Sequence, residues 1–153
     1  MRIRPAQPSE FAALADLLTA AYAPFVGGDH GYMRELRDVA TRAAAAEVLV
    51  TDDLSGTVTF VPHGGPLAEI STPGETEFRM LAVDPAARGH GVGTALMRHV
   101  VDASRGREGI VCSSLAEMTA AHRIYERLGF TRAPERDWSP VAGVDLLAFA
   151  LQF

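Results

Sequence analysis

A glycine-rich segment between a strand and a helix constrains the fold and function of this chain more than any other feature. Residues 77–83 are expected to form a strand, which the turn at residues 84–85 stops, and residues 88–93 then read Arg-Gly-His-Gly-Val-Gly. An amphipathic helical pattern follows. Glycines at such a junction allow positive φ angles and a close ligand approach. The free N–H groups of the first helical turn favour an anion, so the segment predicts a phosphate or pyrophosphate site.

Two other phosphate motifs do not fit this segment. A P-loop ends in Gly-Lys-Ser/Thr, whereas Gly93-Thr94 lacks the lysine. A dinucleotide-binding fingerprint has its third glycine one residue later and lies early in a βαβ unit, whereas this loop lies past mid-chain. The glycine spacing alone leaves an ordinary turn with a helix N-cap as the alternative.

The order of strand and helix patterns predicts an α+β fold with mixed strand pairing. We expect about seven strands and about four helices from the apolar periodicity. No repeat or linker interrupts the chain, so residues 1–153 are predicted to form a single domain. The expected strands are residues 2–4, 48–50, 56–62, 77–83, 110–114, 130–132 and 144–153, and the expected helices follow Ser9, span residues 31–46, follow Gly93 and run from Thr119 to Gly129.

Composition and charge exclude several classes of protein. Hydrophobic residues make up 48% of the chain, but no apolar run reaches the roughly 18 residues that a membrane span needs. No secretory pattern opens the sequence, and the one cysteine, Cys112, cannot close an internal disulfide, which suits the cytoplasm. The net charge of −5 argues against nucleic acid, and the histidines lack metal-ligand spacing. We expect a cytoplasmic protein with no metal, nucleic-acid or membrane partner.

A second motif lies in residues 121–130, which read Ala-His-Arg-Ile-Tyr-Glu-Arg-Leu-Gly-Phe. With the Arg-x-x-Gly-x-Gly of residues 88–93 before it, the chain resembles the GNAT superfamily of N-acetyltransferases over essentially its full length. The resemblance implies a mostly antiparallel sheet, splayed between its fourth and fifth strands. It implies acetyl-CoA as co-substrate in that cleft and direct attack by a primary amine in a ternary complex. The amine acceptor would be a small molecule or a peptide.

The same resemblance implies which residues contact the co-substrate. The family often has an asparagine where this chain has Met118, and a thioether is a poor replacement for an amide. The N–H of Leu81 is expected to donate to the thioester oxygen. The pantetheine arm is expected along Leu81, Ala82 and Val83, and the pyrophosphate on Arg88, Gly89, His90, Gly91, Val92, Gly93 and Thr94.

Tyr125, in the second motif, matches the family tyrosine that protonates the departing CoA thiolate. A phenol with a pKa near 10 is protonated at neutral pH, and it can donate to a thiolate whose thiol has a pKa near 8.5. The alternative is a core aromatic residue, because Ile124 and Leu128 share its helical stripe.

Glu77 is the expected general base, because a substrate ammonium must lose a proton before its nitrogen can attack. One alternative is an exposed strand-edge glutamate, in solvent or paired with Arg79, and another is a water chain with no dedicated base. Strand alternation predicts Glu77, Arg79, Leu81 and Val83 on one face of the strand and Phe78, Met80 and Ala82 on the other.

The acceptor is expected between the loops of residues 22–32 and 134–144, which the resemblance associates with acceptor binding. Aromatic and acidic side chains there suit a cationic amine. These side chains are Tyr22, Phe25, Asp29, His30, Tyr32, Asp137 and Trp138.

A rival function is a non-catalytic acyl-CoA-binding sensor or scaffold, which Met118 and the uncertain base keep open. An ATP-binding function is weaker, because no lysine or magnesium-binding pattern accompanies the glycines. The hydrophobic residues 146–151 could pair within the sheet or across a homodimer.

Overall fold

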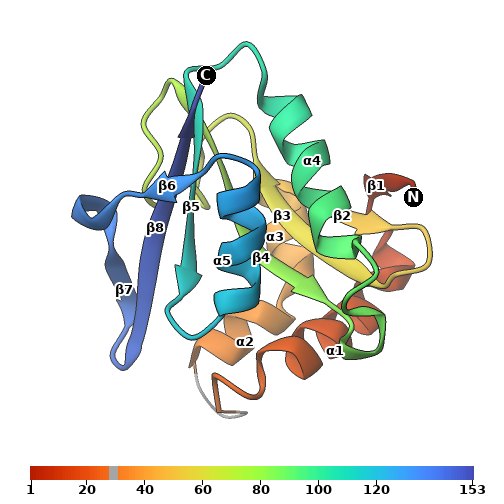
Figure 1. Ribbon diagram of the computed structural model, residues 1–153. Coiled ribbons are helices and arrows are strands. Elements are labelled where there is room, and N and C mark those ends of the chain that lie inside the picture. The colour runs from red at the N-terminus through yellow and green to blue at the C-terminus, as the bar shows by residue number, and fades with distance from the viewer. Residues whose placement is uncertain (28–30) are drawn as a thin grey trace.

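The computed structural model describes residues 1–27 and 31–153 (Figure 1). Within them, eight strands form one sheet and five α-helices flank it. The strands are β1 (Ile3–Pro5), β2 (Glu47–Thr51), β3 (Gly56–Val61), β4 (Glu75–Val83), β5 (Gly109–Leu115), β6 (Thr131–Arg132), β7 (Trp138–Val141) and β8 (Val144–Gln152). The helices are α1 (Phe11–Tyr22), α2 (Gly31–Arg37), α3 (Val39–Ala45), α4 (Val92–Ser104) and α5 (Thr119–Arg127).

The sheet is mixed and mostly antiparallel. Its strand order is β1-β2-β3-β4-β5-β8-β6, with β7 paired to β8. Only the central pair, β4 and β5, is parallel among the described strands. The helix α4 connects these two strands, as parallel pairing requires. The expected α+β fold with a mixed sheet is confirmed.

One expected helix is two helices in the structure. The pattern of residues 31–46 predicted a continuous helix, but the chain leaves helical geometry at Asp38, with φ −83° and ψ 65°. The Asp38 side chain accepts a hydrogen bond from the Thr41 backbone N–H at 3.3 Å and so caps α3. Aspartate is favoured at this position because its oxygen satisfies an unpaired N–H of the first turn.

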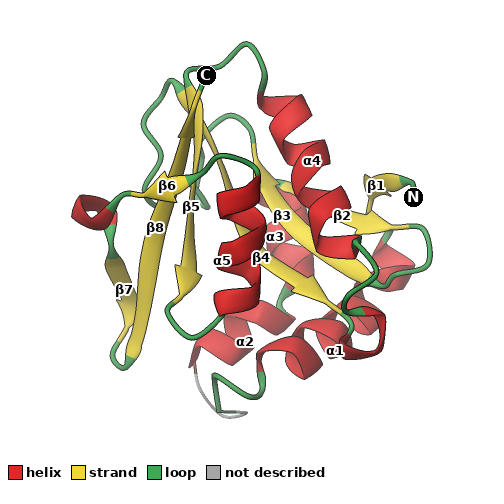
Figure 2. Ribbon diagram, in the orientation of Figure 1, coloured by secondary structure: helices red, strands yellow, loops and turns green. Residues whose placement is uncertain are grey.

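Helices cover both faces of the sheet, and each face has its own apolar core. Figure 2 shows α4 and α5 in front of the sheet and α3 behind it. The core behind the sheet packs α1 and α2 residues such as Leu14 and Leu36 against Met80. The core in front packs Leu96 and Phe149 around the centre of the sheet. Among the described residues, no helix is long and apolar enough to cross a membrane.

The sheet opens between β4 and β5. Their paired register runs from Glu75 with Gly109 to Phe78 with Cys112 and then stops. Beyond that point β4 pairs only with β3, and β5 continues only with β8. Figure 1 shows the two strands diverging toward their carboxyl ends. The splay that the family resemblance implied is therefore present.

A β-bulge in β4 accompanies the opening. The register with β3 shifts between Thr57 and Thr59, so three steps along β4 face two steps along β3. Within this bulge Met80 has φ 56°, a left-handed value that is uncommon for a residue other than glycine. Bulges of this kind bend a strand and change the direction of its side chains.

The bulge also corrects the alternation that we expected. Simple alternation placed Phe78 and Leu81 on opposite faces of β4, which is wrong. Both pack in the core with α4 and α5, whereas Met80 and Ala82 pack in the core with α1 and α2. The extra residue at the bulge moves every later side chain of β4 to the other face.

Candidate active site in the cleft between β4 and β5

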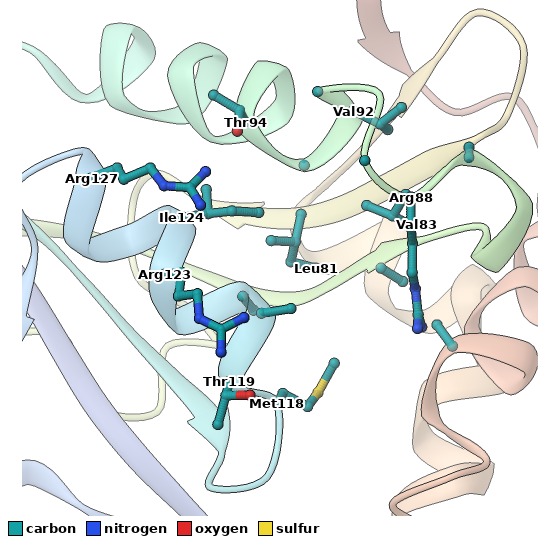
Figure 3. A pocket seen from close by; sticks show the side chains of 18 of the residues that line it. Leu81, Val83, Arg88, Val92, Thr94, Met118, Thr119, Arg123, Ile124 and Arg127 are labelled. Carbon is teal, nitrogen blue, oxygen red and sulfur yellow. The ribbon is translucent and has the colours of Figure 1, made fainter.

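A cavity of about 460 Å³ lies where the sheet opens. Its walls are the end of β4, the glycine loop, the first turn of α4, one side of α5 along its length and the end of α1 (Figure 3). The volume lies in the range of small-molecule binding sites. Nine of the ten residues predicted to hold the co-substrate line this cavity, and His90 does not. The nine are Leu81, Ala82, Val83, Arg88, Gly89, Gly91, Val92, Gly93 and Thr94.

The glycine loop presents backbone to this cavity. Gly89 and Gly91 both have φ 80°, in the left-handed region that favours glycine. Gly91 is the N-cap of α4 and offers no side-chain cap. A Cβ atom at either glycine would meet nothing within 4 Å, so the space beside the loop is open. The first N–H groups of α4 have no partner within the helix and suit an anion.

Gly93 permits the close approach of α4 to α5 at the wall of the cleft. A Cβ atom at Gly93 would lie 2.8 Å from Cδ1 of Ile124. Such a separation is too short for two carbon atoms, so a side chain at Gly93 would require the end of the Ile124 side chain to move. Gly93 therefore lets Ile124 of α5 lie directly against the first turn of α4.

Three arginines line the cleft in a chain whose net charge is −5. Arg88 comes from the glycine loop, and Arg123 and Arg127 come from α5 (Figure 3). Residues four apart on a helix share one face, so Arg123 and Arg127 address the same space. We did not single out these two residues in the sequence, although their spacing of four on the helix predicted before Gly129 indicates that they share one face. Together the three cations favour a polyanionic ligand.

Tyr125 is a core residue with its hydroxyl group at the opened strand. Its ring contacts Phe78 at 5.4 Å and Phe149 at 5.5 Å between centroids. Ser114 is near its hydroxyl group and lies two residues beyond the last β5 residue paired with β4. Burial raises its pKa well above the usual 10. The side chain is not among those lining the cleft.

A second tyrosine hydroxyl faces the opposite strand. Tyr22, at the end of α1, donates a hydrogen bond of 3.2 Å to the carbonyl oxygen of Leu81. Burial raises its pKa well above 10, so it remains a donor at neutral pH. We expected Tyr22 to take part in acceptor binding; the structure places its hydroxyl at the bulged segment of β4.

Glu77 is fully buried and anchors a loop. Its Oε1 atom accepts hydrogen bonds from the backbone N–H groups of Glu69, Ile70 and Ser71, at 3.1, 3.2 and 3.0 Å. Its Oε2 atom has no hydrogen-bond partner among the described residues. The alternative of an exposed glutamate is wrong, because the side chain has no exposed surface. Glu77 does not line the cleft, and its role as base stays a prediction.

Arg79 is not the partner of Glu77. Its guanidinium group pairs with Glu35 at 3.0 Å and with Glu69 at 3.2 Å. The pKa of Glu69 is raised, first by burial and then by the charge of Glu77, while Arg79 opposes the shift. The region behind β4 is therefore an ionic cluster that joins α2, the loop before β4 and the strand itself.

A smaller cavity of about 140 Å³ adjoins the cleft and shares Phe25 and Glu117 with it. Two carboxylates, those of Glu117 and Asp145, line it. Both lie on exposed residues. Its other lining residues are Val26, Gly27, Leu115, Ala116, Gly143 and Val144.

Of the described residues expected to bind the acceptor, Phe25 lines the two cavities, whereas Tyr22, Tyr32, Asp137 and Trp138 do not. Asp137 pairs with Arg132 at 2.8 Å, and the indole N–H of Trp138 donates to Ser113 at 3.1 Å. Tyr32 is buried. Asp29 and His30 lie outside the described residues.

In this cleft a glycine loop that suits an anion adjoins the opened edge of a splayed sheet. A family model described as an acetyltransferase (GNAT) domain matches residues 30–132. The chain therefore belongs to the GNAT acetyltransferase family. No curated protein matches the chain in sequence.

Solved structures show the same fold over nearly the whole chain. An acetyltransferase of the GNAT family from Staphylococcus aureus Mu50 is similar at a TM-score of 0.74 and 13% identity, over 99% of this chain and 98% of that one. A Salmonella typhimurium protein described as an acetyltransferase, solved with its cofactor acetyl-CoA, has a TM-score of 0.67 and 21% identity, over 99% and 92%. A chain from the NatC complex bound to Gag peptide and CoA has a TM-score of 0.67 and 16% identity, over 99% and 98%.

Proposed function

We propose that this protein transfers the acetyl group of acetyl-CoA to a primary amine, by direct attack in a ternary complex. The observation that carries the proposal is the single cleft that joins the glycine loop to the opened edge of β4. Family membership and the acetyl-CoA in the Salmonella neighbour support it.

The residues of the cleft fit the parts of acetyl-CoA. The N–H groups at the start of α4 and Arg88 suit its pyrophosphate, and Arg123 and Arg127 suit its remaining phosphate charge. Met80 and Leu81 have no partner residue in the register of β3 with β4, and the pairing of β4 with β5 has already ended at Phe78. The Leu81 N–H is our proposed donor to the thioester oxygen, an interaction of about 2.7–4 kcal/mol in related chemistry.

Tyr125 is our proposed general acid. As the thioester C–S bond breaks, its electron pair passes to sulfur, and the phenolic proton of Tyr125 moves to that sulfur. The raised pKa keeps the hydroxyl group protonated before the step. Glu77 is our proposed base, and Oε2 is the oxygen of its carboxylate that is free to receive a proton through water.

The smaller cavity is the proposed route for the acceptor. It meets the cleft at Phe25 and Glu117, beyond the opened ends of the strands. Carboxylates at Glu117 and Asp145 favour an amine that arrives as a cation, from a small molecule or a peptide.

A second candidate function is a non-catalytic acyl-CoA-binding sensor or scaffold. Met118 favours it, because this thioether lines the cleft where the family often has an asparagine amide. Such a protein would bind acetyl-CoA without releasing free thiol.

The test is thiol release from acetyl-CoA with a panel of primary amines, for the wild-type protein and Tyr125→Phe. We expect Tyr125→Phe to lower kcat by about 10²-fold, which is the lower end of general-acid effects. The affinity for acetyl-CoA, measured by calorimetry, should change by less than about twofold, since the hydroxyl group acts in the chemical step. Equal kcat values would remove Tyr125 from the mechanism, and no thiol release with any amine would favour the sensor.

A further inference from the structure

Three consecutive backbone N–H groups converge on one oxygen of the buried Glu77 carboxylate. The N–H groups of Glu69, Ile70 and Ser71 all donate to Oε1, at 3.1, 3.2 and 3.0 Å. Within the described chain, Oε2 has no hydrogen-bond partner. The two oxygens of this carboxylate therefore have different surroundings, because the segment of residues 69–71 holds Oε1 alone.

Arg79 holds the first residue of this segment. Its guanidinium group donates to the Glu69 carboxylate at 3.2 Å and to the Glu35 carboxylate of α2 at 3.0 Å. The Arg79 side chain is only 3% exposed, so salt and water screen these two ion pairs much less than they screen pairs at the surface. Glu69 is thus fixed by its side chain while its N–H group donates to Glu77.

Arg136 holds the second residue of the segment. It lies in the short turn after β6 and donates a hydrogen bond to the carbonyl oxygen of Ile70. The same guanidinium group contacts both carboxylate oxygens of Glu75, at 3.0 and 2.6 Å. A two-point pair of this kind fixes the orientation of the arginine. The Ile70 peptide group is therefore fixed at its carbonyl oxygen, on the far side from the N–H of Ile70.

We infer that Arg79 and Arg136 are positioning residues for Glu77, an inference that rests on the proposed function and its base. The two arginines fix residues 69 and 70, and the N–H groups of the segment fix Oε1. The carboxylate then cannot turn without breaking three hydrogen bonds, so Oε2 is the oxygen that receives the proton of the substrate ammonium through water. Neither arginine donates to Glu77 itself in the described structure.

The orientation of this carboxylate matters because proton transfer depends on short distances. A base must lie within hydrogen-bond reach of the proton, directly or through one water. The last torsion of a glutamate is broad and roughly two-fold, so a carboxylate without the segment would present either oxygen. A misplacement of about 1 Å can lower a rate by about 10²-fold.

Arg107 provides a matched control in the same loop. It donates to the carbonyl oxygens of Pro62 and Pro73, at 2.7 and 2.6 Å, and so holds the two ends of the loop. Its hydrogen bonds reach neither residues 69–71 nor Glu77. Arg107→Ala therefore loosens the loop and leaves every contact of the three donors in place. A merely structural role of the loop would make it behave like the other variants.

Three further substitutions separate positioning from proton transfer. Glu69→Ala removes the carboxylate that Arg79 holds, keeps the backbone N–H and leaves Arg79 paired with Glu35. Arg136→Ala removes the contact to Ile70. The side chains of Glu69 and Arg136 are partly exposed, at 30% and 22%, so these variants disturb the core less than a change of Arg79 itself. Glu77→Gln keeps an oxygen for the three N–H groups and removes the base.

The experiment measures kcat and the KM for acetyl-CoA, using the amine of the panel that releases thiol fastest. We expect Glu77→Gln to lower kcat by about 10²-fold. Glu69→Ala and Arg136→Ala should each lower kcat by about threefold to tenfold, with KM within about twofold. Arg107→Ala should keep kcat within about twofold of wild type. In a Glu77→Gln background, Glu69→Ala and Arg136→Ala should lower kcat no further, because the base that they position is gone.

The possible failures are distinguishable. The inference is wrong, and the base survives, if Glu77→Gln is slow while Glu69→Ala and Arg136→Ala keep the wild-type kcat. The same holds if they lose as much in the Glu77→Gln background, or if Arg107→Ala is equally slow. A fully active Glu77→Gln removes the base, and the positioning role fails with it while acetyl transfer stands. No thiol release with any amine ends the proposed function and this inference together.

A second readout needs no acceptor. Hydrogen exchange of the amides of Glu69, Ile70 and Ser71, followed residue by residue by NMR, reports whether their N–H groups stay bonded to Oε1. Exchange at these amides should rise in Arg136→Ala and at the two neighbours of residue 69 and at residue 69 itself in Glu69→Ala. It should stay at the wild-type rate in Arg107→Ala. Unchanged exchange in both Glu69→Ala and Arg136→Ala would show that the arginines do not hold the segment.

Discussion

Single residues set the geometry of this cleft, and Gly91 is the clearest case. Its φ of 80° costs glycine little, whereas an L side chain in that region costs about 1–2 kcal/mol. The space beside its Cα is open to the cleft. A methyl group at Gly91 would therefore strain the loop and stand where an anion approaches.

The matched comparison is Gly91→Ala with Gly106→Ala. Gly106 also has a left-handed φ, 95°, and lies beyond the end of α4, away from the cleft. We expect both variants to lose about 1–2 kcal/mol of unfolding free energy in urea. Only Gly91→Ala should weaken acetyl-CoA binding, by about tenfold in calorimetry, which is one lost contact of about 1.4 kcal/mol. Equal affinities of the two variants for acetyl-CoA would show that the glycine loop is not part of the binding site.

His122 makes stability depend on pH. Its pKa in the folded protein is below the unfolded value of 6.5, first because of burial, while Glu126 opposes and Arg132 adds to the shift. The unfolded chain therefore binds the proton more readily, and the stabilising effect is present above pH 6.5 and is lost as pH falls. Between pH 7.5 and 5, wild type should lose more stability than His122→Gln. The urea midpoints measure this, and parallel curves would contradict it.

At the residue level, the sequence could predict the glycine loop, but not the surroundings of Tyr125 or the hydrogen bond between Ser114 and His122. The glycines were visible because few other residues adopt φ near 80°. Ser114 and His122 lie on different elements, and nothing in the order of the chain brings their side chains together.

At the scale of elements, the loop of residues 62–74 is tied to the sheet by side chains of its neighbours. Glu77 accepts three of its backbone N–H groups. Arg107 donates to the carbonyl oxygens of Pro62 and Pro73 at 2.7 and 2.6 Å. Because Glu77 is both the anchor and our proposed base, its substitution should have two separable effects.

We expect Glu77→Ala to increase hydrogen exchange throughout residues 62–74 and to lower the unfolding free energy by about 1–3 kcal/mol. The reason is that buried N–H groups lose their acceptor. Glu47→Ala, at an exposed position of β2, is the control and should change neither quantity. If exchange in the loop stays at the wild-type rate, the anchoring role is wrong. A fall in kcat that is then rescued at high pH would support the base.

The strands and helices were largely predictable from periodicity, and the bulge was not. Residues 77–80 alternate between polar and apolar side chains and residues 80–83 are all apolar, a pattern that fits a strand but does not by itself place an extra residue at Met80. The bulge depends on β3 pairing through Thr57 and Thr59 and on the cores on both sides. The break at Asp38 could have been found, because aspartate is a common N-cap.

At the scale of the whole molecule, the cleft exists because the two central strands part and helices cover both faces. Its cations come from two distant segments, the glycine loop and α5, in a chain that is acidic overall. Net charge therefore says little about what this site binds, whereas the local arrangement of Arg88, Arg123 and Arg127 does. The sequence could predict the loop but not that α5 would place two arginines beside it.

The most direct test of this account is a calorimetric titration of the purified protein with acetyl-CoA, with ATP as the control. ATP shares the phosphates and adenine but lacks the pantetheine arm that the opened edge of β4 would hold. We predict saturable binding of acetyl-CoA, with a Kd in the range of about 1 μM to 1 mM that is usual for enzyme substrates. ATP should bind at least about tenfold more weakly. No binding of acetyl-CoA, or equal binding of both ligands, would contradict the assignment of the cleft between β4 and β5 as an acetyl-CoA site.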